Sequence, residues 1–216
     1  MISAQEHNRF QINFSPVFND SIIHFDETSF KLLSGDSVQF DVLKFYISSI
    51  ALLNNQKQVW IEANSFHLID AAKENSLSIE LKTPEKIQFN QIKFNLGIDS
   101  ITNTSGAMGG DLDPTKGMYW TWQNGYINFK LEGRSNLCQT RKNEFQFHLG
   151  GYQYPFNSLQ SIILKADNQE KISVAIDLGK LMNSIDLGKE NQIMIPGKEA
   201  VMISKQVADI FSIQAK

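Results

Sequence analysis

Short segments in which polar and apolar residues alternate recur along most of the chain, and they limit what it can fold into. Clear examples are residues 9–14, 77–81, 92–98 and 144–149. Side chains two residues apart in an extended chain face the same side, so each segment predicts a strand with one buried face. Many short strands separated by turn signals predict a mainly β protein, with the architecture of an antiparallel β-sandwich.

The pattern changes near the C-terminus, where apolar residues follow the spacing of one helical face. The two series are Leu178, Leu181, Met182 and Ile185, and then Ile203, Val207, Ile210 and Phe211. We therefore expect two short helices within residues 178–216, laid on the sandwich. No repeat, low-complexity tract or linker interrupts the sequence. Residues 1–216 are predicted to form a single domain, with residues 1–7 as a flexible tail.

Charge and hydropathy exclude two classes of function. The formal net charge is −3, and Lys and Arg are scattered without a run that could follow a phosphate backbone. A nucleic-acid-binding protein usually carries a basic face, so we expect no nucleic-acid partner. No apolar stretch approaches the roughly 20 residues that a membrane-spanning helix needs, so we expect no transmembrane segment.

The first residues and the single cysteine bear on the compartment. Cys138 is the only cysteine, so no disulfide can form within the chain. Residues 1–6 lack the charged and apolar regions of a signal peptide. Residues 2–5, Ile-Ser-Ala-Gln, nevertheless look like the end of a leader at its cleavage point. An exported chain whose leader is absent and an ordinary N-terminal tail are both compatible with these residues.

The least ordinary passage is residues 106–133, in which a glycine-rich loop runs into a tryptophan pair and then a strand. The loop is long enough to be functional rather than a simple connection. Trp120 and Trp122 are two residues apart, so they are predicted to lie side by side. Such a pair could stack on a sugar ring or contact a protein, or it could pack in the sandwich core.

Residues that could bind metal lie in and around the same passage. Asp111 and Asp113 could hold Ca²⁺ through carboxylate oxygens, although Asp-x-Asp-Pro is also common turn chemistry. Met108 and His148 offer the soft sulfur and imidazole that suit copper. An unmodified tryptophan is a poor ligand, because its indole nitrogen only donates hydrogen bonds. Standard catalytic motifs are absent, and we expect that the protein is not an enzyme.

Four passages carry a resemblance to a known family. They read Ile-Lys-Phe-Asn-Leu-Gly-Ile-Asp at 92–99, Gly-Asp-Leu-Asp-Pro at 110–114, Met-Tyr-Trp-Thr-Trp-Gln-Asn-Gly-Tyr at 118–126 and Phe-Gln-Phe-His-Leu-Gly at 145–150. In order and spacing they resemble the MbnP family, the methanobactin-partner-protein-like copper proteins. Trp-x-Trp-Gln-x-Gly-Tyr followed by Phe-His-Leu-Gly is its most specific part.

The resemblance implies an exported, β-rich protein of the periplasm or cell surface. In better-known members, a di-haem peroxidase of the MbnH type oxidises one tryptophan to kynurenine, and copper binds through that group and histidine. By position, Trp120 or Trp122 would be modified and His148 would bind the metal. The sequence departs from the family at 100–105, which lacks the Asn-His of copper-binding members. One copper ligand would then be absent, or it would be replaced by His67, His24 or Met108.

Overall fold

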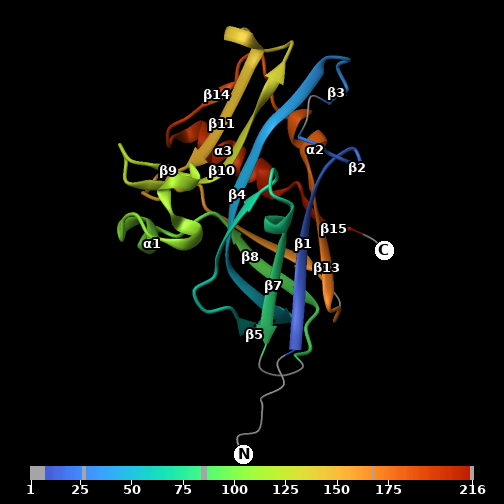
Figure 1. Cartoon of the computed structure of the whole chain (residues 1–216), viewed down its shortest axis with the longest axis vertical. Helices are drawn as coiled ribbons and strands as arrows, with labels where there is room; N and C mark the ends of the chain where they lie inside the picture. The colour runs from blue at the N-terminus through green and yellow to red at the C-terminus, as the bar shows by residue number, and fades with distance from the viewer. Residues whose placement is uncertain (1–7, 26–27, 84–86, 167, 215–216) are drawn as a thin grey trace, which may run out of the picture.

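Two β-sheets face each other across a core rich in phenylalanine. In the computed structural model, which describes residues 8–25, 28–83, 87–166 and 168–214, the ring of Phe14 on one sheet lies 5.9 Å from Phe45 and 6.1 Å from Phe94 on the other. These centroid distances are typical of edge-to-face aromatic packing. The predicted β-sandwich is therefore confirmed (Figure 1). The predicted tail at 1–7 lies outside the described residues.

The smaller sheet has five strands, and the parallel pair at its centre could not be read from the sequence. Its strands are β1 (Asn8–Phe18), β2 (Ser21–Ile22), β7 (Ser78–Thr83), β13 (Lys171–Asp177) and β15 (Phe211–Ile213). β1 pairs with β13 in parallel and with β7 and β2 in antiparallel register. In the larger sheet β11 and β14 are also parallel. Both sheets are therefore mixed: most strand pairs are antiparallel, as the sequence predicted, and these two pairs are parallel.

The larger sheet is organised around β4 (Ser37–Asn54), an 18-residue strand. Its main order is β12 (Gln160–Lys165), β8 (Gln91–Leu96), β4, β10 (Gly125–Ser135), β11 (Glu144–Gly150) and β14 (Gln192–Ile193). The short strands β3 (Ser29–Lys31), β5 (Lys57–Ile61) and β6 (Phe66–Asp70) also pair with β4, and β9 (Tyr119–Trp120) pairs with β10. The pairing register of β4 shifts near Asp41 and near Ser49. At each shift the alternation of its side chains changes phase, so the core-facing positions move by one residue.

Three α-helices occur among the described residues: α1 (Ser100–Thr104), α2 (Leu178–Met182) and α3 (Lys198–Ala208). α2 and α3 confirm the two predicted C-terminal helices, and α3 buries Ala200, Ile203 and Val207 against the sandwich. The second helix ends before Phe211, which instead begins β15. In the described part of the chain, no helix is long and apolar enough to cross a membrane.

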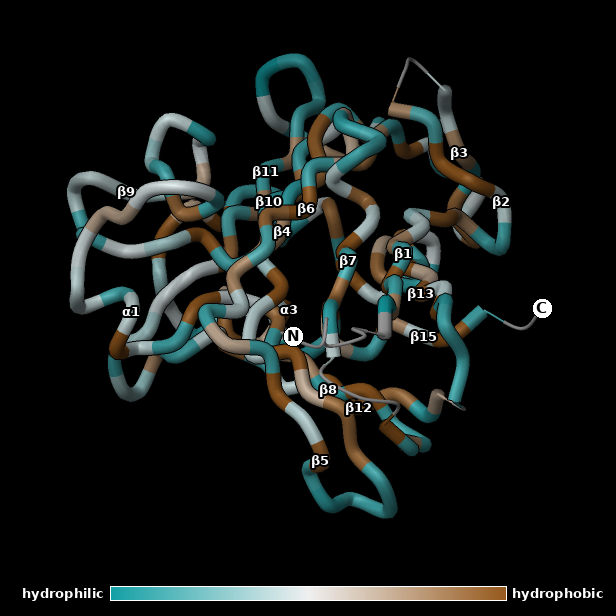
Figure 2. Tube along the Cα trace, turned by 60° about the horizontal axis from the view of Figure 1, so that its bottom comes forward, coloured by the Kyte–Doolittle hydropathy of each residue, from teal (hydrophilic) through white to brown (hydrophobic). Residues whose placement is uncertain are grey.

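The connection from β8 to β9, residues 97–118, covers the outer face of the larger sheet. It contains α1 and the 3-10 turns η2 (Gly110–Leu112) and η3 (Pro114–Lys116) before it reaches β9. Further 3-10 turns are η1 (Glu74–Leu77) and η4 (Arg141–Asn143). Beneath this connection is a second hydrophobic cluster, separate from the main core, made of Tyr46, Leu68, Ile98, Leu112, Met118, Trp120, Tyr126 and Ile127. Figure 2 shows that the chain around α1 and β9 is mostly pale or hydrophilic, with isolated hydrophobic positions. These few apolar side chains therefore anchor an otherwise polar loop.

Candidate functional site

The tryptophan pair lies on the hairpin between β9 and β10. Trp120 pairs with Gly125 across the hairpin, and Trp122 follows in the turn. The ring centroids are 5.8 Å apart with the planes at 43°, which confirms that the two indoles are neighbours. Their environments differ strongly, because Trp120 is only 7% exposed whereas Trp122 is 64% exposed. One indole therefore belongs to the second hydrophobic cluster and the other faces solvent.

The ring of Trp120 packs against Gly150 on β11, where any larger residue would collide with it. A β-carbon added to Gly150 would stand 2.6 Å from Cζ3 of Trp120 and 2.8 Å from the carbonyl oxygen of Tyr126. Side chains two residues apart on a strand share a face, so His148 projects from the same face of β11 as this contact. The fold thus brings Trp120 and His148 to neighbouring positions on one sheet face, although they are far apart in the sequence.

His148 is buried and is paired with a carboxylate. Its Nε2 lies 2.6 Å from Oε1 of Glu132 on β10, and Nζ of Lys130 lies 3.2 Å from the same oxygen. The hydrogen bond with His148, together with the charge of Lys130, lowers the pKa of Glu132 below its ordinary value, although burial opposes this shift. Glu132 is therefore an ionised acceptor placed between two cationic or donor groups. No pattern in the sequence distinguishes Glu132 from other glutamates in strands.

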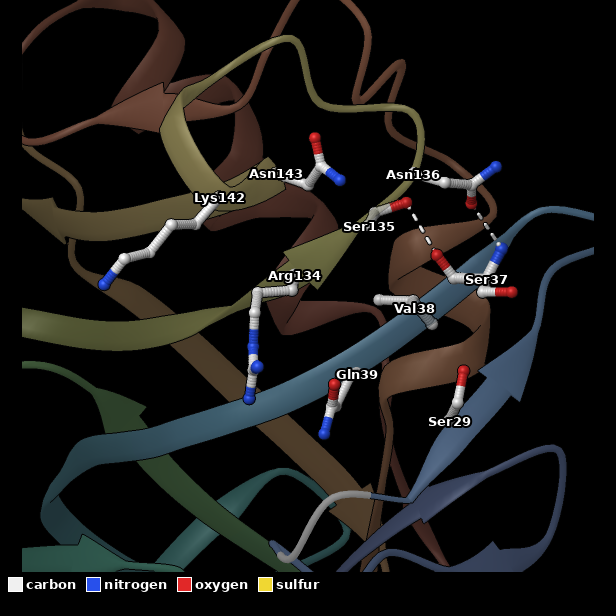
Figure 3. A pocket seen from close by; sticks show the side chains of 9 residues that line it. All are labelled: Ser29, Ser37, Val38, Gln39, Arg134, Ser135, Asn136, Lys142 and Asn143. Carbon is white, nitrogen blue, oxygen red and sulfur yellow. Dashed lines mark hydrogen bonds between the residues drawn. The ribbon is translucent and has the colours of Figure 1, made fainter.

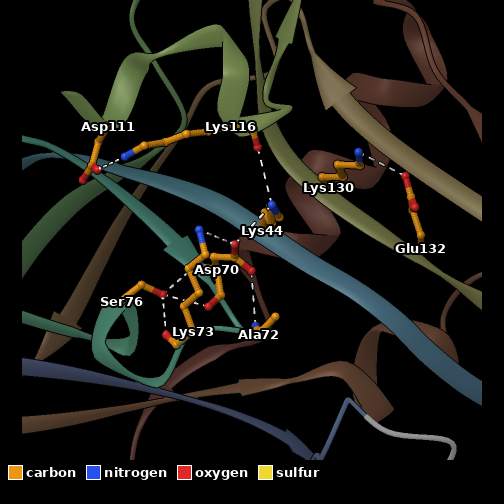
Figure 4. Close-up of polar contacts among 9 residues, drawn as sticks. All are labelled: Lys44, Asp70, Ala72, Lys73, Ser76, Asp111, Lys116, Lys130 and Glu132. Atoms are coloured by element: carbon orange, nitrogen blue, oxygen red, sulfur yellow. Dashed lines mark hydrogen bonds and ion pairs between the residues drawn. The ribbon is translucent and has the colours of Figure 1, made fainter. Parts of the chain in front are cut away.

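Further ion pairs extend this polar network along the outer sheet face (Figure 4). Lys44 binds Asp70 at 3.1 Å, and its ammonium also donates to the carbonyl of Lys116. Asp70 is almost completely buried, and Lys73 lies 3.6 Å from it. Because the carboxylate is matched by two ammonium groups, its burial does not leave an unpaired charge.

The two aspartates proposed for calcium have other partners. Asp111 pairs with Lys116 at 2.6 Å and accepts from the backbone N–H of Leu68 at 3.0 Å. Asp113 caps η3 by accepting from the backbone N–H and the hydroxyl of Thr115, and these bonds lower its pKa. The arrangement corresponds to turn and capping chemistry, which was the alternative reading of these residues. It gives no support to a calcium site.

The other proposed metal ligands are not assembled around His148. His67 on β6 is paired with Glu62 at 2.8 Å. β6, β4, β10 and β11 are successive neighbours, so His67 and His148 are separated by three strand spacings, about 14 Å. They cannot hold the same ion, which corrects the expectation that His67 could complete the site. His24, the other histidine suggested as a replacement ligand, lies beyond β2 and next to the smaller sheet.

Met108 remains close to the tryptophan pair through its backbone. Its N–H donates to the hydroxyl of Tyr126 at 3.0 Å, and Tyr126 belongs to the same cluster as Trp120. The Met108 side chain is partly exposed. Within the described ranges, no group of three or more His, Cys, Asp or Glu side chains is placed to hold a metal ion. Of these four residue types, the described side chains around His148 therefore offer a copper ion one imidazole, beside the carboxylate of Glu132.

Two buried asparagines hold the loop in place and were not identified from the sequence. The amide of Asn103 on α1 donates to the carbonyls of Ile98 and Asp99 and accepts from the N–H of Tyr126. Asn128 on β10 accepts from the N–H of Ile98 and donates to Ser158. Both residues look like ordinary polar positions in a strand or loop. Only the three-dimensional structure shows that they fasten the loop to β10.

A polar cavity of about 190 Å³ lies at the opposite end of β4 and β10. Figure 3 shows Gln39 and Arg134 on these neighbouring strands, with Lys142 and Asn143 approaching from η4. Arg134 forms a two-point hydrogen bond with Asp41, so its charge is neutralised. The residues that line this cavity are not those of the tryptophan site. A second cavity, about 300 Å³, is lined by His67, Asp70, Lys73, Asp111 and Lys116.

The fold and the site define a class: a β-sandwich protein with a tryptophan pair on one hairpin and a buried, carboxylate-bound histidine on the covered face of its larger sheet. The MbnP family model matches residues 7–197. The chain belongs to the MbnP family, which is methanobactin-associated and connected with copper handling. Its structure is similar to that of MbnP from Methylosinus trichosporium, with a TM-score of 0.64, 12% identity, and coverage of 85% of this chain and 80% of that chain. Comparison with curated proteins found no match.

Proposed function

We propose that this protein is a non-catalytic, exported copper-handling protein that binds copper through His148 and a kynurenine formed from Trp120. The observation that supports the proposal is the contact of Trp120 with Gly150, two residues from His148 on the same strand face. Two equivalents of hydrogen peroxide, used by an oxidising haem partner, would cleave the C2–C3 bond of the indole. Hydrolysis then releases C2 as formate and leaves an aniline nitrogen with an available lone pair. An aniline nitrogen and an imidazole nitrogen together form a donor set that suits copper.

The burial difference distinguishes the two tryptophans. Trp120 is the proposed ligand precursor because its ring is enclosed and adjoins the strand that carries His148. Trp122 is the exposed member of the pair, and its ring contacts Trp120. An oxidising partner would therefore meet Trp122 first. Trp122 is proposed to connect the solvent side with the enclosed ring.

The oxidation requires a second protein, for which we propose a di-haem peroxidase of the MbnH type. Large apolar side chains are exposed on the loops near the tryptophan hairpin, as expected for a surface that meets another protein. They include Ile101 on α1 and Tyr154 and Phe156 on the loop after β11. This loop adjoins both α1 and the hairpin, because Ser100 donates to the carbonyl of Tyr152, and the Tyr152 ring lies beside Gly125.

Mass spectrometry and copper titration test the proposal. Protein from its native host should contain kynurenine at position 120, and it should bind one Cu(I) ion with an affinity that His148→Ala abolishes. His67→Ala is the matched control, because His67 is also paired with a carboxylate but lies three strands away. Loss of binding in both variants, or in neither, would contradict the proposed site.

Carbohydrate recognition is the second candidate, and the exposure of Trp122 is the observation that favours it. A solvent-facing indole can stack on a sugar ring. A glycan array with unmodified protein would reveal such binding, and Trp122→Ala should remove any signal. Retention of the signal in Trp122→Ala would exclude the aromatic pair as the recognition surface.

A further inference from the structure

His148 and Glu132 form a close side-chain pair on the covered face of the larger sheet. Nε2 of His148 lies 2.6 Å from Oε1 of Glu132, and both side chains are largely buried. Lys130 occupies the other side of the same carboxylate oxygen at 3.2 Å. The register of β10 and β11 fixes this arrangement, because Lys130 pairs directly with His148 and Glu132 is one pleat further along the same face.

The carboxylate determines which ring nitrogen carries the proton. An ionised carboxylate only accepts hydrogen bonds, so the nitrogen facing Glu132 must donate and therefore carries a hydrogen. The neutral ring then has its lone pair on the other nitrogen, Nδ1. Carboxylate partners of this kind commonly orient metal-binding histidines and raise their basicity.

We propose that Glu132 is a positioning residue that keeps the proton on Nε2 of His148 and leaves Nδ1 as the nitrogen that coordinates the metal. This inference rests on the proposed function, because it assigns the ligand atom of the same site. Lys130 contributes by holding the carboxylate oxygen in place. The near oxygen of Glu132 is shared by His148 and Lys130, so the carboxylate is held in place beside the imidazole.

Side-chain ¹⁵N NMR of the metal-free protein tests the proton position without any metal. At a pH where the ring is neutral, His148 should show a protonated Nε2 and an unprotonated Nδ1. Glu132→Ala should abolish this preference and produce a mixture of the two tautomers. Glu132→Gln should retain it, because Lys130 attracts the amide oxygen to the side that faces His148.

His67 provides an internal control for these spectra. It has a comparable carboxylate partner, Glu62, at 2.8 Å. Glu62→Ala should change the His67 signals and leave those of His148 unchanged. A wild-type His148 that carries its proton on Nδ1, or a Glu132→Ala variant with an unchanged tautomer, would overturn the inference.

Cu(I), which is diamagnetic, supplies the second measurement on kynurenine-containing protein. Its addition should shift the Nδ1 resonance of His148, and Glu132→Ala should weaken Cu(I) binding about 10–100-fold. A smaller loss is expected for Glu132→Gln. A shift at Nε2 instead of Nδ1 would overturn the positioning role while leaving the copper function intact. Absence of any response to Cu(I) would contradict the proposed function itself.

Discussion

The indole of Trp120 occupies the space in which a side chain on Gly150 would lie. Only 2.6 Å separate Cζ3 of Trp120 from the position of a β-carbon on Gly150, and real β-carbons do not approach other atoms so closely. Because Gly150 is at the end of β11, this contact fixes how the hairpin that carries Trp120 sits on the strand that carries His148.

Gly150→Ala should displace the Trp120 ring. The added methyl also meets the carbonyl of Tyr126, so the backbone cannot easily yield. We expect a loss of about 1–3 kcal/mol in the free energy of unfolding, as for other overpacked sites, and a red-shifted tryptophan emission. Urea unfolding and fluorescence measure both effects. Gly109→Ala is the matched control, because a β-carbon there meets no atom within 4 Å. Equal losses in the two variants would contradict the steric argument.

The two tryptophans should differ in their contribution to stability. Trp120→Ala removes a buried ring from the second hydrophobic cluster and should cost about 3–5 kcal/mol. Trp122→Ala removes an exposed ring and should change stability by less than about 0.5 kcal/mol. Denaturant unfolding of unmodified protein provides the comparison. Similar values for both variants would show that the hairpin does not pack as described.

Asn103→Ala should loosen the loop that precedes the tryptophans. The substitution leaves the carbonyl of Ile98 and the N–H of Tyr126 without a partner in a buried position. An unsatisfied buried polar group costs about 1–3 kcal/mol, and hydrogen exchange of the Tyr126 amide should accelerate. Thr104→Ala, at an exposed neighbouring position, should change neither measurement appreciably. Unchanged exchange at Tyr126 in Asn103→Ala would contradict the fastening role.

Stability should fall at alkaline pH in a manner that depends on Tyr46. Burial is the main cause that raises the pKa of this phenol above its ordinary value of 10.0. A group whose pKa is raised on folding contributes stability below its unfolded pKa and loses that contribution as pH rises through the folded pKa. We therefore expect the free energy of unfolding to decline above about pH 10. Tyr46→Phe should reduce this decline, as urea unfolding at pH 8 and pH 11 would show. An identical decline in Tyr46→Phe would assign the effect to other groups, among them Tyr126, whose pKa burial also raises.

Local patterns were sufficient to predict individual strands and the direction of their side chains. Residues 144–149 alternate, and β11 indeed buries Phe145, Phe147 and Leu149 in the main core while His148 projects from the other face. The polar face of this strand would be expected to meet solvent, but it is covered in the structure, so His148 is also buried. Alternation specifies the side of the strand, but it carries no information about what a distant loop places on that side.

The composition of the site could be predicted only in part. Trp120 and Trp122 were predicted to be neighbours because two residues separate them in the chain, and their rings do lie in contact. Nothing in that spacing predicts that one ring is buried and the other exposed. Glu132 was not identified, because the sequence does not show that this strand residue pairs with His148. His67 was grouped with His148 by residue type, although three strand spacings separate them.

By itself, the sequence determined the β-rich class, the C-terminal helices and the family, because strand and helix periodicity and short motifs are properties of neighbouring residues. Only the tertiary structure decided the parallel pairing of β1 with β13, the packing of Trp120 against Gly150 and the hydrogen bond between His148 and Glu132. These relations join segments that are distant in the chain. They depend on strand order and register, which are set by the packing of the whole core rather than by any local pattern.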